Sequence, residues 1–177
     1  MNSISVRGLT KRYGSLVAVN DISFEVEQGE CLALLGPNGA GKTTTTEVLE
    51  GFRHADSGEV RVLGVDPRHG GLGWKARLGI VLQTDRDLGD LTVREAVRHF
   101  AAYFPSPRDP EEVIEAVGLG SKATSRNDRL SGGQRRRLDV ALGIIGNPEL
   151  LFLDEPTTGF DPAARREFWA LIESLKA

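Results

Sequence analysis

The chain has 177 residues, a formal net charge of −3, 40% hydrophobic residues and 27% charged residues. These values are typical of a folded globular domain and exclude an intrinsically disordered chain. The slightly negative charge does not indicate a basic surface for phosphate backbones, so we expect no nucleic-acid partner. No apolar run approaches the roughly 20 residues that cross a bilayer. We therefore expect any function at a membrane to use a separate membrane-spanning chain.

The N-terminal part of the chain has the pattern of a β structure. We predict strands from Ser3 to Val6 and from Val17 to Val26, separated by a turn at Tyr13 and Gly14. The second of these alternates apolar and polar residues, which is typical of a half-exposed strand. Residues from Glu59 to Leu63 alternate in the same way and predict a further strand.

Three short runs are continuously apolar, as expected for strands that are buried on both faces of a parallel sheet. They are Cys31–Leu35, Gly79–Leu82 and Leu150–Leu153. Cys31 is the single cysteine of the chain, so it forms no internal disulfide, and we interpret it as a small buried hydrophobic residue. The pattern predicts a parallel-sheet core.

Four helices are marked by their first residues. Thr92 and Glu95 form a capping-box pattern, and the helix after them carries one apolar face: Val93, Ala96, Val97, Phe100, Ala101 and Phe104. Asp109-Pro110 opens a helix that ends near Gly118, and Ser131 opens one that runs to about Gly146. Asp161-Pro162 opens the last helix, with an apolar stripe of Phe168, Leu171, Ile172 and Leu175. The segment from about residue 91 to 146 is thus predicted to be mostly helical.

The clearest motif is a glycine-rich segment from Gly36 to Thr43. It matches the phosphate-binding loop pattern, with a predicted strand before it and a predicted helix from Thr44 to Glu50 after it. Glycines let main-chain amides wrap around a phosphate, and the helix N-terminus favours the anion. We expect Lys42 to contact the β- and γ-phosphates and Thr43 to hold Mg²⁺. The predicted nucleotide-binding residues are Gly36, Pro37, Asn38, Gly39, Ala40, Gly41, Lys42, Thr43 and Thr44.

An acidic pair, Asp154 and Glu155, directly follows the predicted strand Leu150–Leu153. Acidic residues at the carboxyl end of such a strand lie where open α/β sheets bind ligands. We predict that Asp154 supports Mg²⁺ and that Glu155 takes a proton from the attacking water. The alternative is a pair of carboxylates that merely caps a following helix. Together with the phosphate loop, the pair predicts an ATPase or a GTPase, and the absence of an Asn-Lys-x-Asp motif disfavours the GTPase.

The segment Leu130-Ser-Gly-Gly-Gln134 resembles the signature motif of ATP-binding cassette (ABC) proteins. The same residues also form a capped helix start, and a capped N-terminus with two glycines is itself an anion site, so both interpretations hold together. The resemblance implies that Ser131, Gly132, Gly133 and Gln134 reach the γ-phosphate of an ATP held by a second ATPase subunit. Two subunits would then close head-to-tail around two ATP molecules, as a homodimer or a heterodimer.

Three further residues match the family pattern. The resemblance implies that Tyr13 stacks on adenine, that Gln83 contacts Mg²⁺ and the attacking water, and that Asp161 lies in the loop that crosses the dimer interface. Taken alone, a tyrosine at such a position more often packs in a core or on a surface. A lone glutamine is more often a solvated side chain.

The resemblance covers essentially the whole chain and implies an α/β fold. This fold has a P-loop NTPase parallel-sheet core, an N-terminal antiparallel β subdomain and an inserted α-helical subdomain. One ABC ATPase domain would span residues 1–177. The core and the β subdomain would take residues 1–83 and 147–177, and the helical subdomain, which includes the signature helix, residues 84–146.

The family pattern also contains elements that are missing here. The family has a switch histidine one strand beyond the last helix, whereas His54, His69 and His99 all precede the signature motif and are interpreted as surface or loop residues. A crossover helix of a parallel sheet should feed another strand, and none follows the helix after Asp161. We therefore expect the sequence to be a C-terminally incomplete part of a longer subunit, which alone would hydrolyse ATP weakly or not at all.

The resemblance implies an ATP-hydrolysing subunit that works with Mg²⁺ and powers transport by an integral membrane permease. Residues 58–64 and 91–104 resemble the type-2 branch of bacterial exporters of drugs, lipids or polysaccharides. The subunit would lie in the cytoplasm, on the inner face of the cell membrane. The aromatic residues Phe100, Tyr103 and Phe104 would either face the permease or pack within the helical subdomain. The alternative is a non-transport ABC ATPase that acts on ribosomes or DNA.

Overall fold

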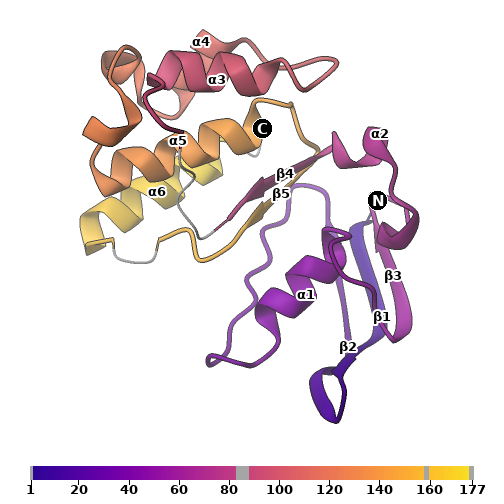
Figure 1. Ribbon diagram of the computed structural model, residues 1–177. Coiled ribbons are helices and arrows are strands. Elements are labelled where there is room, and N and C mark those ends of the chain that lie inside the picture. Colours follow the sequence, from indigo (N-terminus) through magenta and orange to yellow (C-terminus); the bar gives the residue numbers. More distant parts are fainter. Residues whose placement is uncertain (1, 83–87, 158–159, 176–177) are drawn as a thin grey trace. The chain divides into compact units, whose positions relative to one another are not determined.

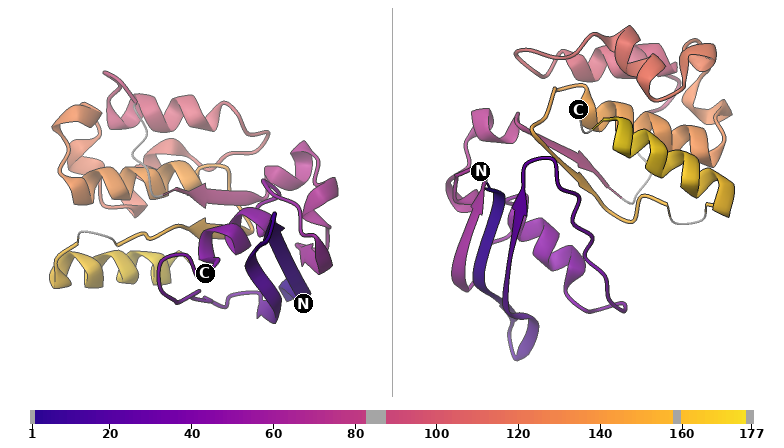
Figure 2. Two further views of the ribbon diagram at one scale, coloured as in Figure 1. Left: turned by 60° about the horizontal axis from the view of Figure 1, so that its bottom comes forward. Right: turned by 180° about the vertical axis from the view of Figure 1, so that it is seen from behind.

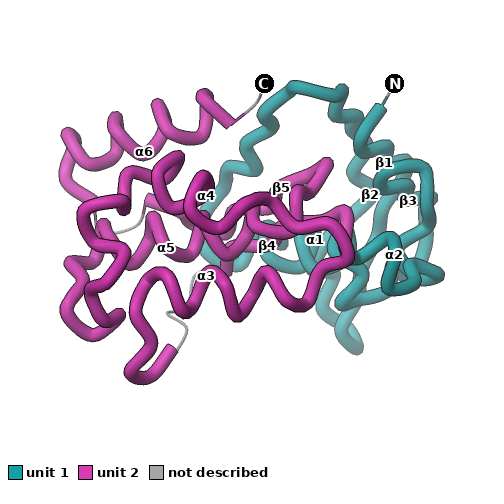
Figure 3. The backbone as a smooth tube through the Cα atoms, turned by 90° about the horizontal axis from the view of Figure 1, so that it is seen from above, with its two compact units in different colours: residues 1–75 teal, residues 76–177 magenta. Residues whose placement is uncertain are grey.

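The computed structural model describes residues 2–82, 88–157 and 160–175. The chain divides into two compact units, residues 1–75 and 76–177 (Figure 3). Among the described residues, no helix has both the length and the apolar composition needed to cross a bilayer. The domain bounds expected from the sequence stay a prediction.

The first unit contains an antiparallel sheet of three strands, β1 (Asn2–Tyr13), β2 (Leu16–Glu27) and β3 (Ser57–Val62), in the order β2-β1-β3 (Figure 1). Val6 of the central strand pairs with Phe24 on one side and with Val60 on the other. Two further views show β1 between its neighbours (Figure 2). The structure confirms the predicted strands and extends the first one to the turn at Gly14, whose φ is 59°.

One helix and two short helical turns complete the first unit. They are α1 (Lys42–Leu49), the 3₁₀ turn η1 (Pro67–His69) and α2 (Leu72–Lys75). The buried indole of Trp74 donates a hydrogen bond of 2.9 Å to the carbonyl oxygen of Val62, which ties α2 to the end of β3. The sequence predicted α1 but neither of the short elements.

The prediction of a buried strand at Cys31–Leu35 is wrong for the described structure. These residues form no strand, Cys31 is exposed, and Leu35 is 90% exposed. A strand needs neighbouring strands to satisfy its main-chain groups, and no described strand pairs with this run. The run thus has the composition of a buried strand, but none of the described strands pairs with it. The interpretation of Cys31 as a buried hydrophobic residue is wrong for the same reason.

The second unit contains two parallel strands, β4 (Leu78–Val81) and β5 (Leu150–Leu153). Leu78 pairs with Leu150, and the register continues to Val81 and Leu153. The main-chain N–H of Asp154 extends the ladder by donating to the carbonyl oxygen of Val81 over 2.9 Å. Both strands were predicted, and the acidic pair follows β5 directly.

Most of the regular secondary structure described in the second unit is helical. The helices are α3 (Val93–Ala101), α4 (Pro110–Ala116), α5 (Gly132–Ile144) and α6 (Pro162–Ser174), with the 3₁₀ turns η2 (Gly120–Lys122) and η3 (Asn127–Arg129). Each long helix begins at the predicted cap. Thr92 and Ser131 form complete capping boxes. Asp109 and Asp161, each followed by a proline, accept hydrogen bonds from main-chain N–H groups in the first turn of the helix. Local chemistry thus fixed the helix starts.

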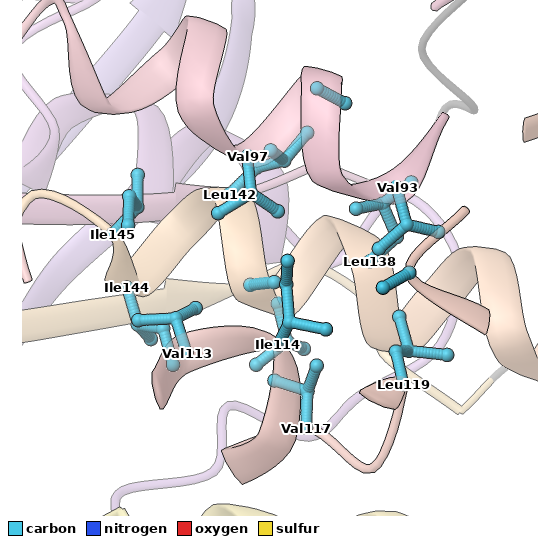
Figure 4. Packing of buried hydrophobic residues seen from close by; sticks show 14 of the residues in the cluster. Val93, Val97, Val113, Ile114, Val117, Leu119, Leu138, Leu142, Ile144 and Ile145 are labelled. Atoms are coloured by element: carbon cyan, nitrogen blue, oxygen red, sulfur yellow. The ribbon is translucent and has the colours of Figure 1, made fainter. Parts of the chain in front are cut away.

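The hydrophobic core of the second unit lies among α3, α4 and α5 (Figure 4). Val97 and Leu138 are 0% and 1% exposed, and Ile114 of α4 is also 1% exposed. Phe168 of α6 belongs to the same cluster. Burying one such side chain contributes about 1.5–3 kcal/mol. This core holds α5, and with it the signature segment, in place.

Candidate functional site

The phosphate loop ends at Gly41, the residue that caps α1. Its φ is 83°, and a Cβ atom built there would lie 2.2 Å from the carbonyl oxygen of Ala18. Only glycine fits this position, because it tolerates positive φ and has no Cβ. With no side chain at the cap, no side-chain oxygen covers the N-terminal N–H groups of α1. A helix start of this kind suits an anion such as phosphate.

Lys42 is folded back over the loop that precedes it. Its Nζ donates to the carbonyl oxygens of Gly36 and Pro37, over 2.8 and 2.9 Å. The ammonium group therefore lies against the loop, where both hydrogen bonds are exposed. An anion held by the loop would face a cation that is already in position. The geometry fits the predicted role of Lys42.

Thr43 lies next to Lys42 and is exposed. Its hydroxyl is the type of oxygen ligand that Mg²⁺ takes beside phosphate oxygens and water. The described residues contain no cluster of three or more histidine, cysteine or acidic side chains that could hold a metal by itself. The role of Thr43 as a Mg²⁺ ligand therefore stays a prediction.

Tyr13 stands at the end of β1 and is 40% exposed. Lys11 Nζ and Arg53 Cζ each lie 5.5 Å from the centre of its ring. Arg53 also pairs with Glu47 of α1, and the hydrogen bond that Arg53 donates to the Glu47 carboxylate raises the pKa of the guanidinium. The ring is thus an accessible aromatic surface with two cations nearby. Arg53 could not be predicted from the sequence, because no local pattern brings residue 53 to residue 13.

The acidic pair occupies an unusual piece of backbone. Glu155 is exposed and has a φ of 41°, which is uncommon for a residue with a side chain. Such conformations cost about 1–3 kcal/mol and persist where the surroundings hold them. Asp154 is half-buried beside it. The end of β5 is therefore held in one particular shape.

The signature segment forms the start of α5. Ser131 Oγ accepts from the N–H of Gln134 over 3.2 Å, and Gln134 Oε1 accepts from the N–H of Ser131 over 3.0 Å. A pocket of about 300 Å³ opens beside this cap. Its lining includes Ser131, Gly133, Gln134, Arg137, Phe160 and Glu167. This capping box is compatible with an anion site, because the main-chain N–H groups of Gly132 and Gly133 also lie at the start of the helix.

Asp161 caps α6. Its Oδ1 accepts from the main-chain N–H groups of Ala163 and Ala164, over 2.8 and 2.9 Å. Both hydrogen bonds lower the pKa of the Asp161 carboxyl group, and the bond from Ala164 has the larger effect. The carboxylate therefore fixes the start of α6, whatever else it contacts.

The predicted site residues divide between the two units. Tyr13 and the loop from Gly36 to Thr44 belong to the first unit, whereas Asp154, Glu155, Asp161 and the signature segment belong to the second. Gln83 lies outside the described residues. Sequence reasoning missed Arg136, which is only 9% exposed in α5. No local pattern distinguishes it from its neighbours Arg135 and Arg137, because its partners lie 18 to 54 positions away in the sequence.

Comparison with known proteins agrees with the motifs. A family model described as "ABC transporter" matches residues 19–158. The chain is 45% identical over 181 residues to the Nod factor export ATP-binding protein I of Rhizobium johnstonii, covering 99% of the chain and 58% of that protein. It is 41% identical over 179 residues to the Nod factor export ATP-binding protein I of Burkholderia orbicola, covering 98% and 59%. The chain thus spans somewhat more than half the length of these relatives.

Solved structures show the same likeness. The cbiO1 protein of Clostridium perfringens, described as part of the ABC transporter complex cbiONQ, has a TM-score of 0.89 and 26% identity, covering 99% of this chain and 74% of that one. An ATP-binding cassette of an ABC transporter in its ADP conformation has a TM-score of 0.86 and 24% identity, covering 99% and 77%. These likenesses confirm the predicted fold class.

Proposed function

This chain belongs to the ABC transporter family, and from that membership we propose that it binds and hydrolyses ATP to power export through a separate membrane-spanning partner. The observation that carries the proposal is the phosphate loop, in which Gly41 meets the Ala18 carbonyl oxygen and Lys42 is held over the loop. The names of the relatives, which refer to ATP binding and export, support it. They give no support to a role on ribosomes or DNA.

The residues of the chain would divide the work by position. The loop amides and Lys42 would hold the phosphates, and Tyr13 would offer its exposed ring to adenine. Thr43 and Asp154, together with Gln83, would hold Mg²⁺, which supplies charge neutralisation on the phosphate oxygens. Glu155 would accept the proton of the attacking water. Two copies, or this chain and a related one, would bury each nucleotide against Ser131–Gln134 of the partner.

The membrane partner and the cellular location belong to the same proposal. A permease would receive the movement of the helical part of the chain, at the cytoplasmic face of the membrane. Tyr103 is 68% exposed on the last turn after α3, whereas Phe100 and Phe104 pack against the core of the second unit. Of the three aromatic residues, Tyr103 thus has the surroundings that suit a contact with another chain.

The experiment uses the complete natural protein, reconstituted with its membrane-spanning partner. We expect ATP turnover that stops in Glu155→Gln while nucleotide binding is kept. Glu112→Gln, an exposed substitution of the same kind on α4, serves as the control and should turn over ATP normally. Unchanged turnover in Glu155→Gln would refute the assigned base. Turnover without any coupled movement of cargo would favour a non-transport ATPase.

A further inference from the structure

Arg136 is a buried cation whose guanidinium group binds three main-chain carbonyl groups. Its Nε donates to Pro156 O over 3.2 Å, its Nη1 to Leu82 O over 2.5 Å and its Nη2 to Asp154 O over 2.7 Å. Arg136 lies in the second turn of α5, and the three carbonyls lie at the ends of β4 and β5. One side chain therefore ties the signature helix to both strand ends within the same unit.

The positions of the accepting groups are informative. Asp154 and Pro156 stand immediately before and after Glu155, so Arg136 holds the main chain on both sides of that residue. Glu155 has the positive φ of 41° that needs support from its surroundings. The Asp154 carbonyl belongs to the peptide plane that leads into Glu155, and the Pro156 carbonyl lies one peptide beyond the plane that follows Glu155. The two bonds therefore hold the main chain before and after this residue. The third bond fixes the same guanidinium to the end of β4.

Arginine is suited to this arrangement because its planar guanidinium presents five N–H donors in a fixed fork. A lysine has a single ammonium group at the end of a flexible stem and cannot reproduce the fork. The charge of Arg136 faces Asp139, with 3.7 Å between Nη1 and Oδ2. The two side chains are 10% and 12% exposed, so the acid one turn along offsets the cost of burying the cation.

The neighbouring arginines make different contacts. Arg135 donates to the carbonyl oxygen of Leu130, within the signature segment, over 3.0 Å. Arg137 donates to Val117 O over 3.2 Å and pairs with Glu167. Arg136 alone among the three is classed as buried and reaches the strand ends. Its role does not follow from the arginine run as a whole.

We propose that Arg136 is a positioning residue for hydrolysis. It sets the orientation of Glu155 by binding the main-chain carbonyls of the two neighbouring residues, Asp154 and Pro156. The proposal rests on the proposed role of Glu155 as the base. The contacts of Arg136 are to main-chain carbonyls at the strand ends, so its loss should slow the catalytic step and leave nucleotide binding by the phosphate loop in place. It should also couple energetically to Glu155, because both act on the same proton transfer.

The first test compares Arg136→Gln with the parent, both made as the complete protein. Circular dichroism first establishes that both are folded under the assay conditions. We expect kcat to fall at least about tenfold, with KM and the dissociation constant of a fluorescent ATP analogue changed less than about threefold. Arg7→Gln, in an exposed ion pair on β1, is the control and should match the parent. A folded Arg136→Gln protein with the parent's kcat would overturn the proposal.

The second test is a double-mutant cycle with Glu155→Gln. If Arg136 works through Glu155, adding Arg136→Gln to Glu155→Gln should lower the residual rate less than about threefold, since the group to be positioned is already lost. Full additivity would contradict the proposal. If Glu155→Gln itself leaves turnover unchanged, the proposed function fails first, and that result is distinct from a failure of Arg136.

Arg136→Lys keeps the charge and separates positioning from folding. We expect a melting temperature closer to that of the parent than Arg136→Gln shows, together with a kcat that is still lowered at least about threefold, because one ammonium cannot bind three carbonyls in this geometry. A lysine variant that is less stable but turns over ATP at the parent's rate would assign Arg136 to folding alone. Failure of both variants to fold would also assign it to folding and overturn the proposal.

Discussion

Gly79 of β4 and Gly143 of α5 lie so close that a Cβ atom built on Gly79 would be 2.4 Å from the Gly143 carbonyl oxygen. In the other direction, a Cβ on Gly143 would be 2.7 Å from Val81 Cγ2. The signature helix therefore rests directly on a strand, with glycine on both sides of the contact. The same close approach allows Arg136, two turns earlier in α5, to reach the carbonyls at the ends of the strands.

Substitution of Gly143 by alanine should push α5 away from β4. A methyl group has no room beside Val81, and overpacking of this kind costs about 1–3 kcal/mol. Urea unfolding followed by circular dichroism measures the loss. Gly73→Ala is the matched control, because a Cβ there meets nothing within 4 Å in the helix α2, and it should be neutral or slightly stabilising. Equal stability of the two variants would contradict this prediction, because it would show that α5 and β4 can accommodate the methyl group without cost.

Gly41→Ala should damage the phosphate loop itself. The new methyl group would lie 2.2 Å from Ala18 O at a φ of 83°, so the loop must move to accept it. We expect a loss of stability of about 1–3 kcal/mol and ATP binding weakened at least about tenfold, measured by titration with a fluorescent analogue. Gly39→Ala has a similar φ of 82° with nothing within 4 Å and should lose less stability. A Gly41→Ala protein that binds ATP as tightly as the parent would contradict the loop geometry.

We expect Asp66 to contribute to the loss of thermal stability at acidic pH. The pKa of Asp66 is lowered from 3.8 to about 2. The main cause is the hydrogen bond from the Arg68 side chain; the hydrogen bond from the Arg68 main-chain N–H also lowers the pKa, whereas burial opposes the shift. A depressed folded-state pKa adds stability that is complete above 3.8 and is lost as the pH falls toward about 2. Asp66→Asn should therefore flatten the fall in melting temperature across that interval. An unchanged fall in melting temperature would exclude this ion pair as its cause.

Much of the fold followed from local chemistry in the sequence. The caps at Thr92, Asp109, Ser131 and Asp161 were each predicted from two or three residues, and the structure forms them because they satisfy helix N–H groups without distant partners. The parallel strands were also predicted, since their apolar runs are bounded by glycine or acidic residues.

Other features depend on partners that are distant along the chain, and no local pattern announces them. The apolar run Cys31–Leu35 has the composition of a buried strand, but a strand forms only where neighbours pair with it. The clamp of Arg136 joins residues 54, 18 and 20 positions away. The cations beside Tyr13 come from Lys11 and from Arg53, on different segments. Contacts of this kind are set by tertiary packing.

The most direct test of the account is ATP binding and hydrolysis by Lys42→Ala in the complete protein. Lys42 Nζ is already held over the loop by Gly36 O and Pro37 O, and its removal takes away the cation that would face the phosphates. We expect turnover to fall at least about a hundredfold, a loss of about 2.7 kcal/mol or more of transition-state stabilisation, with weaker ATP binding. Lys75→Ala, an exposed lysine in the same unit, should behave as the parent does. Parental ATP binding and turnover in Lys42→Ala would contradict the proposed function.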